Sequence, residues 1–160
     1  MKKFNGLFPI RFDPKELEVN LGEGNFIFVG SGTDAWAFDI PPGWITRFLD
    51  YCNQFNNNYL FQSKDPSRFL EFMGHPVMQK SVLCTTIETN VFYPDIVRNA
   101  PNTRKRAQAM QKLANLGMRT CVTCEPLVKF DLPEMVELIR MCSPRQVNIG
   151  RNSRQDITLP

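Results

Sequence analysis

Short apolar runs alternate along the chain with longer stretches in which apolar residues recur every three or four positions. The runs have the length of strands, and their apolar residues are consecutive, which is typical of strands covered on both faces. The longer stretches predict amphipathic helices. The expected strands are 26–29, 59–62, 81–87, 119–124 and 146–149. The alternation predicts an α/β fold with parallel strands.

Helices are expected to begin near residues 42, 65, 102 and 131, each between two of these strands. Gly117 suits the position after a helix end, where a left-handed backbone conformation is common. Asp131 and Glu134 have the spacing of a capping box, in which the side chain of each residue accepts a hydrogen bond from the backbone N–H of the other. The ends of the helices are therefore marked by residue type as well as by periodicity.

Strands joined by helical crossovers form either a doubly wound sheet or part of a barrel, and both remain open at this point. We expect residues 26–151 to form a partial (β/α) barrel of parallel strands, with an N-terminal extension over 1–25 and a tail over 152–160. An incomplete barrel has an open edge. We therefore expect a missing N-terminal segment or a partner chain to cover it.

Composition places the chain among ordinary globular domains. Its 160 residues are 42% hydrophobic and 22% charged, and 19 Lys and Arg against 16 Asp and Glu give a net charge of +3. This small excess permits a nucleic acid partner but does not indicate one. No apolar run has membrane-spanning length and no signal peptide is evident, so we expect no membrane association and a cytoplasmic location.

The cysteine and histidine content limits metal and redox chemistry. Five cysteines are an odd number, and reduced thiols are expected in a chain of this size. A single histidine, His75, disfavours both zinc sites and hydrolytic triads. The Cys121-Val122-Thr123-Cys124 motif has redox or metal spacing but lies within a predicted strand, where the two cysteines point to opposite faces. Core packing is the favoured interpretation of these cysteines, and we expect no metal site.

Each predicted strand is followed by a polar or charged residue. Ligands of parallel α/β folds bind at the carboxyl ends of the strands, so convergence on one small-molecule site is the favoured interpretation. Unrelated solvent-exposed strand ends are the alternative. The candidates for binding a ligand or cofactor are Ser31, Asp34, Lys64, Glu88, Glu125 and Arg151.

Individual candidates allow more than one role. Lys64 follows an apolar run directly, and its ammonium either pairs with a substrate carboxylate or bonds to Glu88 or Asp65 at the surface. Asp34 lies beside Trp36, an arrangement that can orient a bound polar group. The basic cluster at 104–106 is more typical of a solvated helix face than of a nucleic acid contact.

Four segments stand out together, residues 27–34, 61–68, 86–90 and 124–127. In their order and separation, over about residues 26 to 151, they resemble a phage-associated family of radical-SAM-like barrel proteins of unknown function, distantly similar to spore photoproduct lyase. The resemblance implies a TIM-barrel-like fold whose first strand is followed by a CxxxCxxC loop. Three thiolates of that loop hold a [4Fe-4S] cluster, an iron-sulfur centre that binds S-adenosyl-L-methionine.

The resemblance also implies roles for particular residues. Ser31 and Asp34 would lie near the polar end of S-adenosylmethionine, Lys64 would meet its carboxylate, and Glu88 and Glu125 would face the site. The chemistry of the family is reductive cleavage to a 5′-deoxyadenosyl radical followed by hydrogen abstraction.

No CxxxCxxC motif occurs in these 160 residues, so this chain cannot hold the cluster by the family's route. We expect the chain to be a C-terminal piece of a longer or split protein, with the cluster supplied by a missing segment or a partner chain. The chain is then the S-adenosylmethionine-binding part of a radical-SAM-like enzyme or, alternatively, a non-catalytic α/β binding module that acts with a partner. A doubly wound enzyme binding phosphate at residues 30–33 is a third hypothesis. Whether the chain alone is an enzyme stays open.

Overall fold

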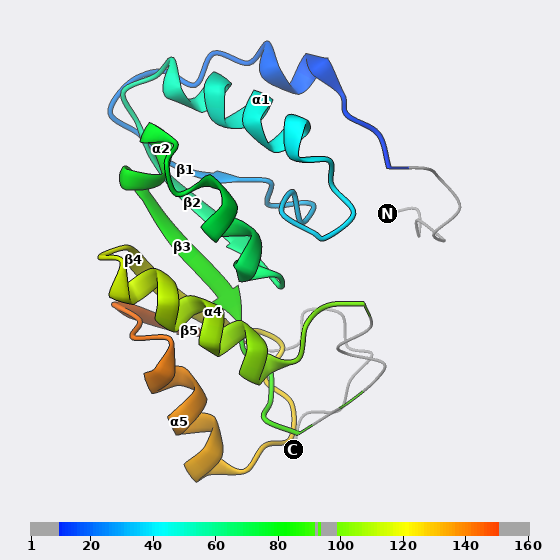
Figure 1. The fold of residues 1–160 in the computed structure, drawn as a ribbon, viewed down its shortest axis with the longest axis vertical. Helices are drawn as coiled ribbons and strands as arrows, with labels where there is room; N and C mark the ends of the chain where they lie inside the picture. Colours follow the sequence, from blue (N-terminus) through cyan, green and yellow to red (C-terminus); the bar gives the residue numbers. More distant parts are fainter. Residues whose placement is uncertain (1–9, 92, 94–98, 151–160) are drawn as a thin grey trace.

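The computed structural model describes residues 10–91, 93 and 99–150, and it is a five-stranded parallel sheet with helices between the strands (Figure 1). The predicted strands are confirmed, with bounds that differ by at most one residue. The strands are β1 (Phe26–Val29), β2 (Asn58–Ser63), β3 (Ser81–Thr86), β4 (Arg119–Cys124) and β5 (Gln146–Ile149).

The strands lie in the sheet in the order β1-β2-β3-β4-β5, and every neighbouring pair is parallel. A doubly wound sheet reverses its strand order at one point, and this sheet does not. Sequential order is the arrangement of a (β/α) barrel. The predicted partial (β/α) barrel is therefore confirmed, and the doubly wound alternative is wrong.

The helical segments lie between consecutive strands, with one short turn before β1. The segment after residue 65 is a tight 3-10 helix rather than an α-helix, and a separate short helix begins at Pro76. The bounds are η1 (Pro14–Leu17), α1 (Pro42–Asn53), η2 (Pro66–Phe72), α2 (Pro76–Gln79), α4 (Thr103–Asn115) and α5 (Leu132–Met141).

The apolar core lies between the helices and one face of the sheet. Alternate strand residues point into it, as the two-residue period of a strand requires. Trp36 is 1% exposed and packs edge-on against Phe69, with ring centroids 4.7 Å apart. The Trp36 ring therefore fills the core, and whether Asp34 orients a bound polar group stays a prediction. The sheet residues of the core are Tyr59, Phe61, Leu83, Val122 and Cys124.

The opposite face of the sheet carries Phe28, Leu60 and Val82 in one row and is more polar toward the carboxyl ends of the strands. Gln62, Cys84 and Cys121 occupy one row across β2, β3 and β4, and Thr86 pairs with Thr123 in the next row. None of these five residues belongs to the apolar core. Cys121 and Cys124 therefore lie on opposite faces of the sheet, as the strand period predicts.

The two outer strands leave edges open. Within the described residues, β1 pairs only with β2, and β5 pairs only with β4. Val147 and Ile149 of β5 are exposed although their register places them on the core face. Among the helices of the described ranges, none has the length and apolar character needed to cross a membrane.

The cap of α5 provides a test of local stability. Asp131 Oδ1 accepts a hydrogen bond from the Glu134 backbone N at 3.1 Å, which is one half of the predicted capping box. The second half is replaced, because Glu134 accepts from the Asn90 amide while Asn90 Oδ1 accepts from the Asp131 backbone N. Asn90 therefore links the start of α5 to the segment after β3 by two hydrogen bonds.

We expect Asp131→Ala to lower the free energy of unfolding by about 1 kcal/mol, the usual cost of losing an N-cap oxygen. Asp131→Asn keeps a cap oxygen and is the matched control, with a stability near wild type. Urea unfolding followed by circular dichroism measures both. Equal stability of the alanine and asparagine variants would contradict a capping role.

Candidate functional site

Asp34 connects the loop after β1 to the end of β2. Its Oδ2 accepts hydrogen bonds from the Ser63 hydroxyl at 3.0 Å and from the Lys64 backbone N at 2.9 Å. Its Oδ1 accepts from the Trp36 backbone N at 3.0 Å. The carboxylate therefore fixes the loop after β1 against the end of β2, and its predicted role in ligand binding stays a prediction.

Lys64 continues this network to the end of β3. Its Nζ lies 2.5 Å from Glu88 Oε1, and its side chain is 37% exposed whereas Glu88 is 1% exposed. The predicted alternative in which Lys64 bonds to Glu88 is thus what the structure contains. An ammonium has three N–H donors, so the bond to Glu88 leaves two of them for a ligand.

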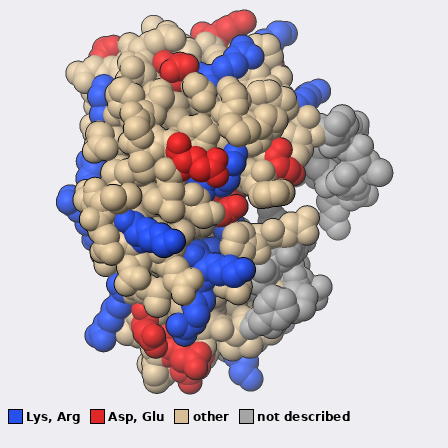
Figure 2. All heavy atoms as spheres, viewed as in Figure 1, with Lys and Arg blue, Asp and Glu red and all other residues tan. Residues whose placement is uncertain are grey.

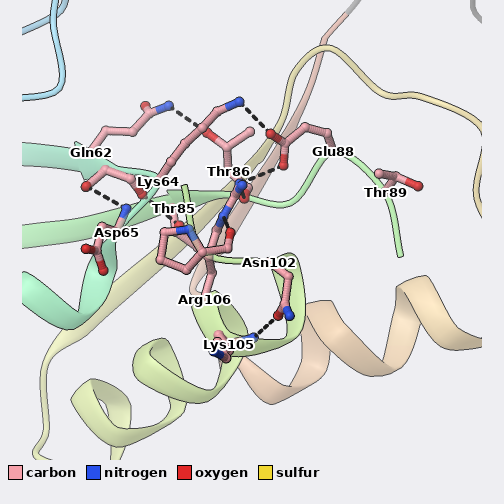
Figure 3. A network of polar contacts seen from close by, with 12 residues as sticks. Gln62, Lys64, Asp65, Thr85, Thr86, Glu88, Thr89, Asn102, Lys105 and Arg106 are labelled. Atoms are coloured by element: carbon pink, nitrogen blue, oxygen red, sulfur yellow. Dashed lines mark hydrogen bonds and ion pairs between the residues drawn. The ribbon is translucent and has the colours of Figure 1, made fainter. Parts of the chain in front are cut away.

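Arg106 near the start of α4 is the second cation bound to Glu88 (Figure 3). Its Nη1 donates to Glu88 Oε2 at 2.8 Å and to the Thr86 carbonyl at 3.0 Å, and its Nε donates to the Pro101 carbonyl at 2.6 Å. The side chain is 0% exposed. Burial lowers the pKa of the guanidinium, and the Glu88 carboxylate opposes that shift. Glu88 is therefore held between two cations from different elements.

Sequence reasoning missed Arg106, because it grouped the residue with a basic cluster on a solvated face. Arg104 and Lys105 are exposed, but Arg106 is buried. A signal was present: Arg106, Met110 and Leu113 are spaced by four and three positions and so lie on one side of the helix. An arginine on the apolar stripe of a helix requires a buried carboxylate partner.

The remaining predicted site residues are not brought into this network. Ser31 is exposed in the turn after β1, where Gly30 has a φ of 73°. Glu125 is exposed and lies across Gly150 so closely that a Cβ there would be 2.7 Å from its Oε2. Within the described part of the chain, neither Ser31 nor Glu125 has a side-chain bond to Asp34, Lys64 or Glu88. Arg151 falls outside the described residues.

A cavity of about 340 Å³ borders the network, between η2 and α4. This volume is within the range of small-molecule sites. Asp65 and Arg106 belong to its lining, and exposed Lys105 and Lys112 supply positive charge. Figure 2 shows Lys and Arg side chains gathered over the middle of this face. The other lining residues are Pro66, Ser67, Leu70, Pro101, Gln108 and Ala109.

The residues of the described ranges do not fit a [4Fe-4S] cluster. No group of three His, Cys, Asp or Glu side chains is placed to hold a metal ion in those ranges. Cys52, Cys124 and Cys142 belong to the apolar core, and burial raises the pKa of their thiols to about 12, 11 and 12. Cysteines of this kind are packing residues rather than cluster ligands.

Comparison with known proteins adds no relative: no family model, no curated protein and no solved structure matches this chain. The resemblance to radical-SAM-like barrels therefore stays a hypothesis. The network of Asp34, Lys64, Glu88 and Arg106 is the feature of the molecule that indicates a function.

The buried pair makes a stability prediction. Glu88→Ala leaves Arg106 buried without its carboxylate, and we expect the free energy of unfolding to fall by about 3–5 kcal/mol. The double variant Glu88→Leu with Arg106→Met removes both charges and should cost less than Glu88→Ala alone. Urea unfolding of each variant measures these differences.

Glu71→Ala is the control, because its ion pair with Arg68 is exposed on the glutamate side and is expected to contribute about 0–1 kcal/mol. A double variant that is less stable than Glu88→Ala would contradict the interpretation that an unpaired buried charge is the cause.

Proposed function

We propose that this chain is a small-molecule-binding module of the (β/α)-barrel type, with S-adenosylmethionine as its ligand at the carboxyl ends of β1, β2 and β3. The observation that carries the proposal is the continuous chain of contacts from Asp34 through Lys64 and Glu88 to Arg106. These residues come from separate segments and meet at the edge where parallel α/β folds bind ligands.

The charges at this edge suit a zwitterionic ligand. The network carries two carboxylates, Asp34 and Glu88, and two cations, Lys64 and Arg106, so it presents charges of both signs. Its carboxylates suit the amino and sulfonium groups of S-adenosylmethionine. The two free donors of Lys64 suit its carboxylate.

We derive no radical step for this chain, because its residues do not fit the cluster that would start one. The proposed role is binding and orientation, and this favours the binding-module alternative for the chain itself. Catalysis then requires a cluster from a missing segment or a partner chain. An iron-sulfur absorption spectrum on co-expression with a CxxxCxxC-bearing partner would support such a subunit role.

Five free cysteines agree with a reducing compartment such as the cytoplasm.

Isothermal titration calorimetry with S-adenosylmethionine tests the proposal. We expect wild type to bind, and we expect Lys64→Ala to weaken binding by about 10- to 100-fold, because a charge-assisted hydrogen bond contributes about 1.5–3 kcal/mol. Lys15→Ala removes an exposed lysine of η1 and should leave affinity unchanged.

The possible outcomes test the identity of the ligand and the role of Lys64 separately. Absence of binding by folded wild-type protein would overturn S-adenosylmethionine as the ligand. Equal affinity of wild type and Lys64→Ala would remove Lys64 from the site. S-adenosylhomocysteine, which lacks the sulfonium charge, should bind more weakly if the carboxylates of the network contribute.

A further inference from the structure

Two cysteines meet across neighbouring strands on the polar face of the sheet. Cys84 of β3 and Cys121 of β4 are direct partners in the parallel register. Neighbouring strands lie about 4.8 Å apart, which is within the Cα separation of about 4.4–6.8 Å that disulfides span. The two cysteines are therefore paired at a Cα separation that a disulfide can span.

The surroundings of this pair differ from those of the other cysteines. Cys84 Sγ lies 3.3 Å from the Thr123 hydroxyl, which is on the same face. The neighbouring Cys121 thiol and that hydroxyl lower the pKa of Cys84, whereas contact with Cys84 and burial raise the pKa of Cys121. Burial raises the pKa of Cys52, Cys124 and Cys142. The Thr123 hydroxyl beside Cys84 Sγ can stabilise a thiolate there, so Cys84 is the better placed attacking thiol of the pair.

We propose that Cys84 and Cys121 form a reversible disulfide across β3 and β4, with Cys84 as the attacking thiol and Cys121 as the resolving thiol. The geometry that carries this inference is their shared register position and shared sheet face, outside the apolar core. The inference is independent of the proposed ligand. It also excludes the Cys121-Val122-Thr123-Cys124 spacing as the redox motif, because Cys124 lies on the other face.

The oxidant is a peroxide, since Cys84 and Cys121 are only 1% and 5% exposed and a small molecule is needed to reach them. The Cys84 thiolate attacks one peroxide oxygen, the O–O bond breaks, and hydroxide leaves with the electron pair. This yields a sulfenic acid on Cys84. Cys121 then attacks that sulfur, loses its proton, and displaces the sulfenic oxygen as water. Two thiols are oxidised and one peroxide is reduced.

The test treats the native full chain with hydrogen peroxide, alkylates the remaining thiols under unfolding conditions, and maps peptides by mass spectrometry. We expect one disulfide, joining the peptides of Cys84 and Cys121, with the other three cysteines alkylated. Dithiothreitol should restore five alkylated cysteines. Five free thiols after peroxide, or a link between Cys121 and Cys124, would overturn the proposal.

Single variants assign the two roles. Cys121→Ser should stop at a sulfenic acid on Cys84, which dimedone traps, and Cys84→Ser should give no dimedone adduct at Cys121. Cys142→Ser, a core position, is the control and should retain the disulfide. A dimedone adduct on Cys121 but not on Cys84 would reverse the assignment and contradict the proposed attacking thiol. Where a variant fails to fold, the wild-type peptide map alone decides whether the disulfide forms.

Discussion

The ion pair between Glu88 and Arg106 is the constraint on which the carboxyl edge of the sheet depends. Neither side chain reaches water, so each charge requires the other. Their contact fixes the end of β3 against the start of α4, and Arg106 also binds the Pro101 carbonyl of the loop between them. Lys64 attaches the end of β2 to the same carboxylate. Such a pair adds little net stability compared with apolar residues of similar size, and its main effect here is to position the surrounding polar groups.

Much of the fold could be predicted because the apolar runs, the helical periodicity and the residues at helix ends agree with the tertiary arrangement. The strand at 119–124 was found at its observed bounds, since an apolar, β-branched run follows a helix that ends before Gly117. The segment 66–72 was predicted as helical but adopts 3-10 geometry. The segment is short, and a second helix begins soon after it at Pro76. Short helical segments commonly adopt the tighter 3-10 geometry. Sequence periodicity separates helix from strand, but it does not resolve the two helix types.

The site was less predictable, because it depends on register and on tertiary partners. Sequence placed Lys64 and Glu88 after neighbouring strands, but it could not decide whether Lys64 bonds to Glu88 or stays free for a ligand. Arg106 was missed because adjacent basic residues suggested a solvated face. The strand period correctly separated Cys121 from Cys124, yet it could not identify Cys84 as the neighbour of Cys121. That pairing follows from the register of β3 and β4, which brings together two cysteines that are 37 residues apart along the chain (121 − 84).

The composition of the two sheet faces explains why the strands follow one another in sequence order. A doubly wound sheet has a helix layer on each face, so it requires both faces to be apolar. Here one face carries Gln62, Thr86 and Thr123 next to the apolar row of Phe28, Leu60 and Val82. An unpaired buried amide or hydroxyl costs about 1–3 kcal/mol. These groups instead satisfy one another along the face: the Gln62 amide donates to the Thr86 hydroxyl at 3.3 Å, and Thr123 contacts Cys84. The buried core cluster lies on the other face. The polar positions near the carboxyl ends of the strands therefore fit the barrel-like arrangement better than a doubly wound one.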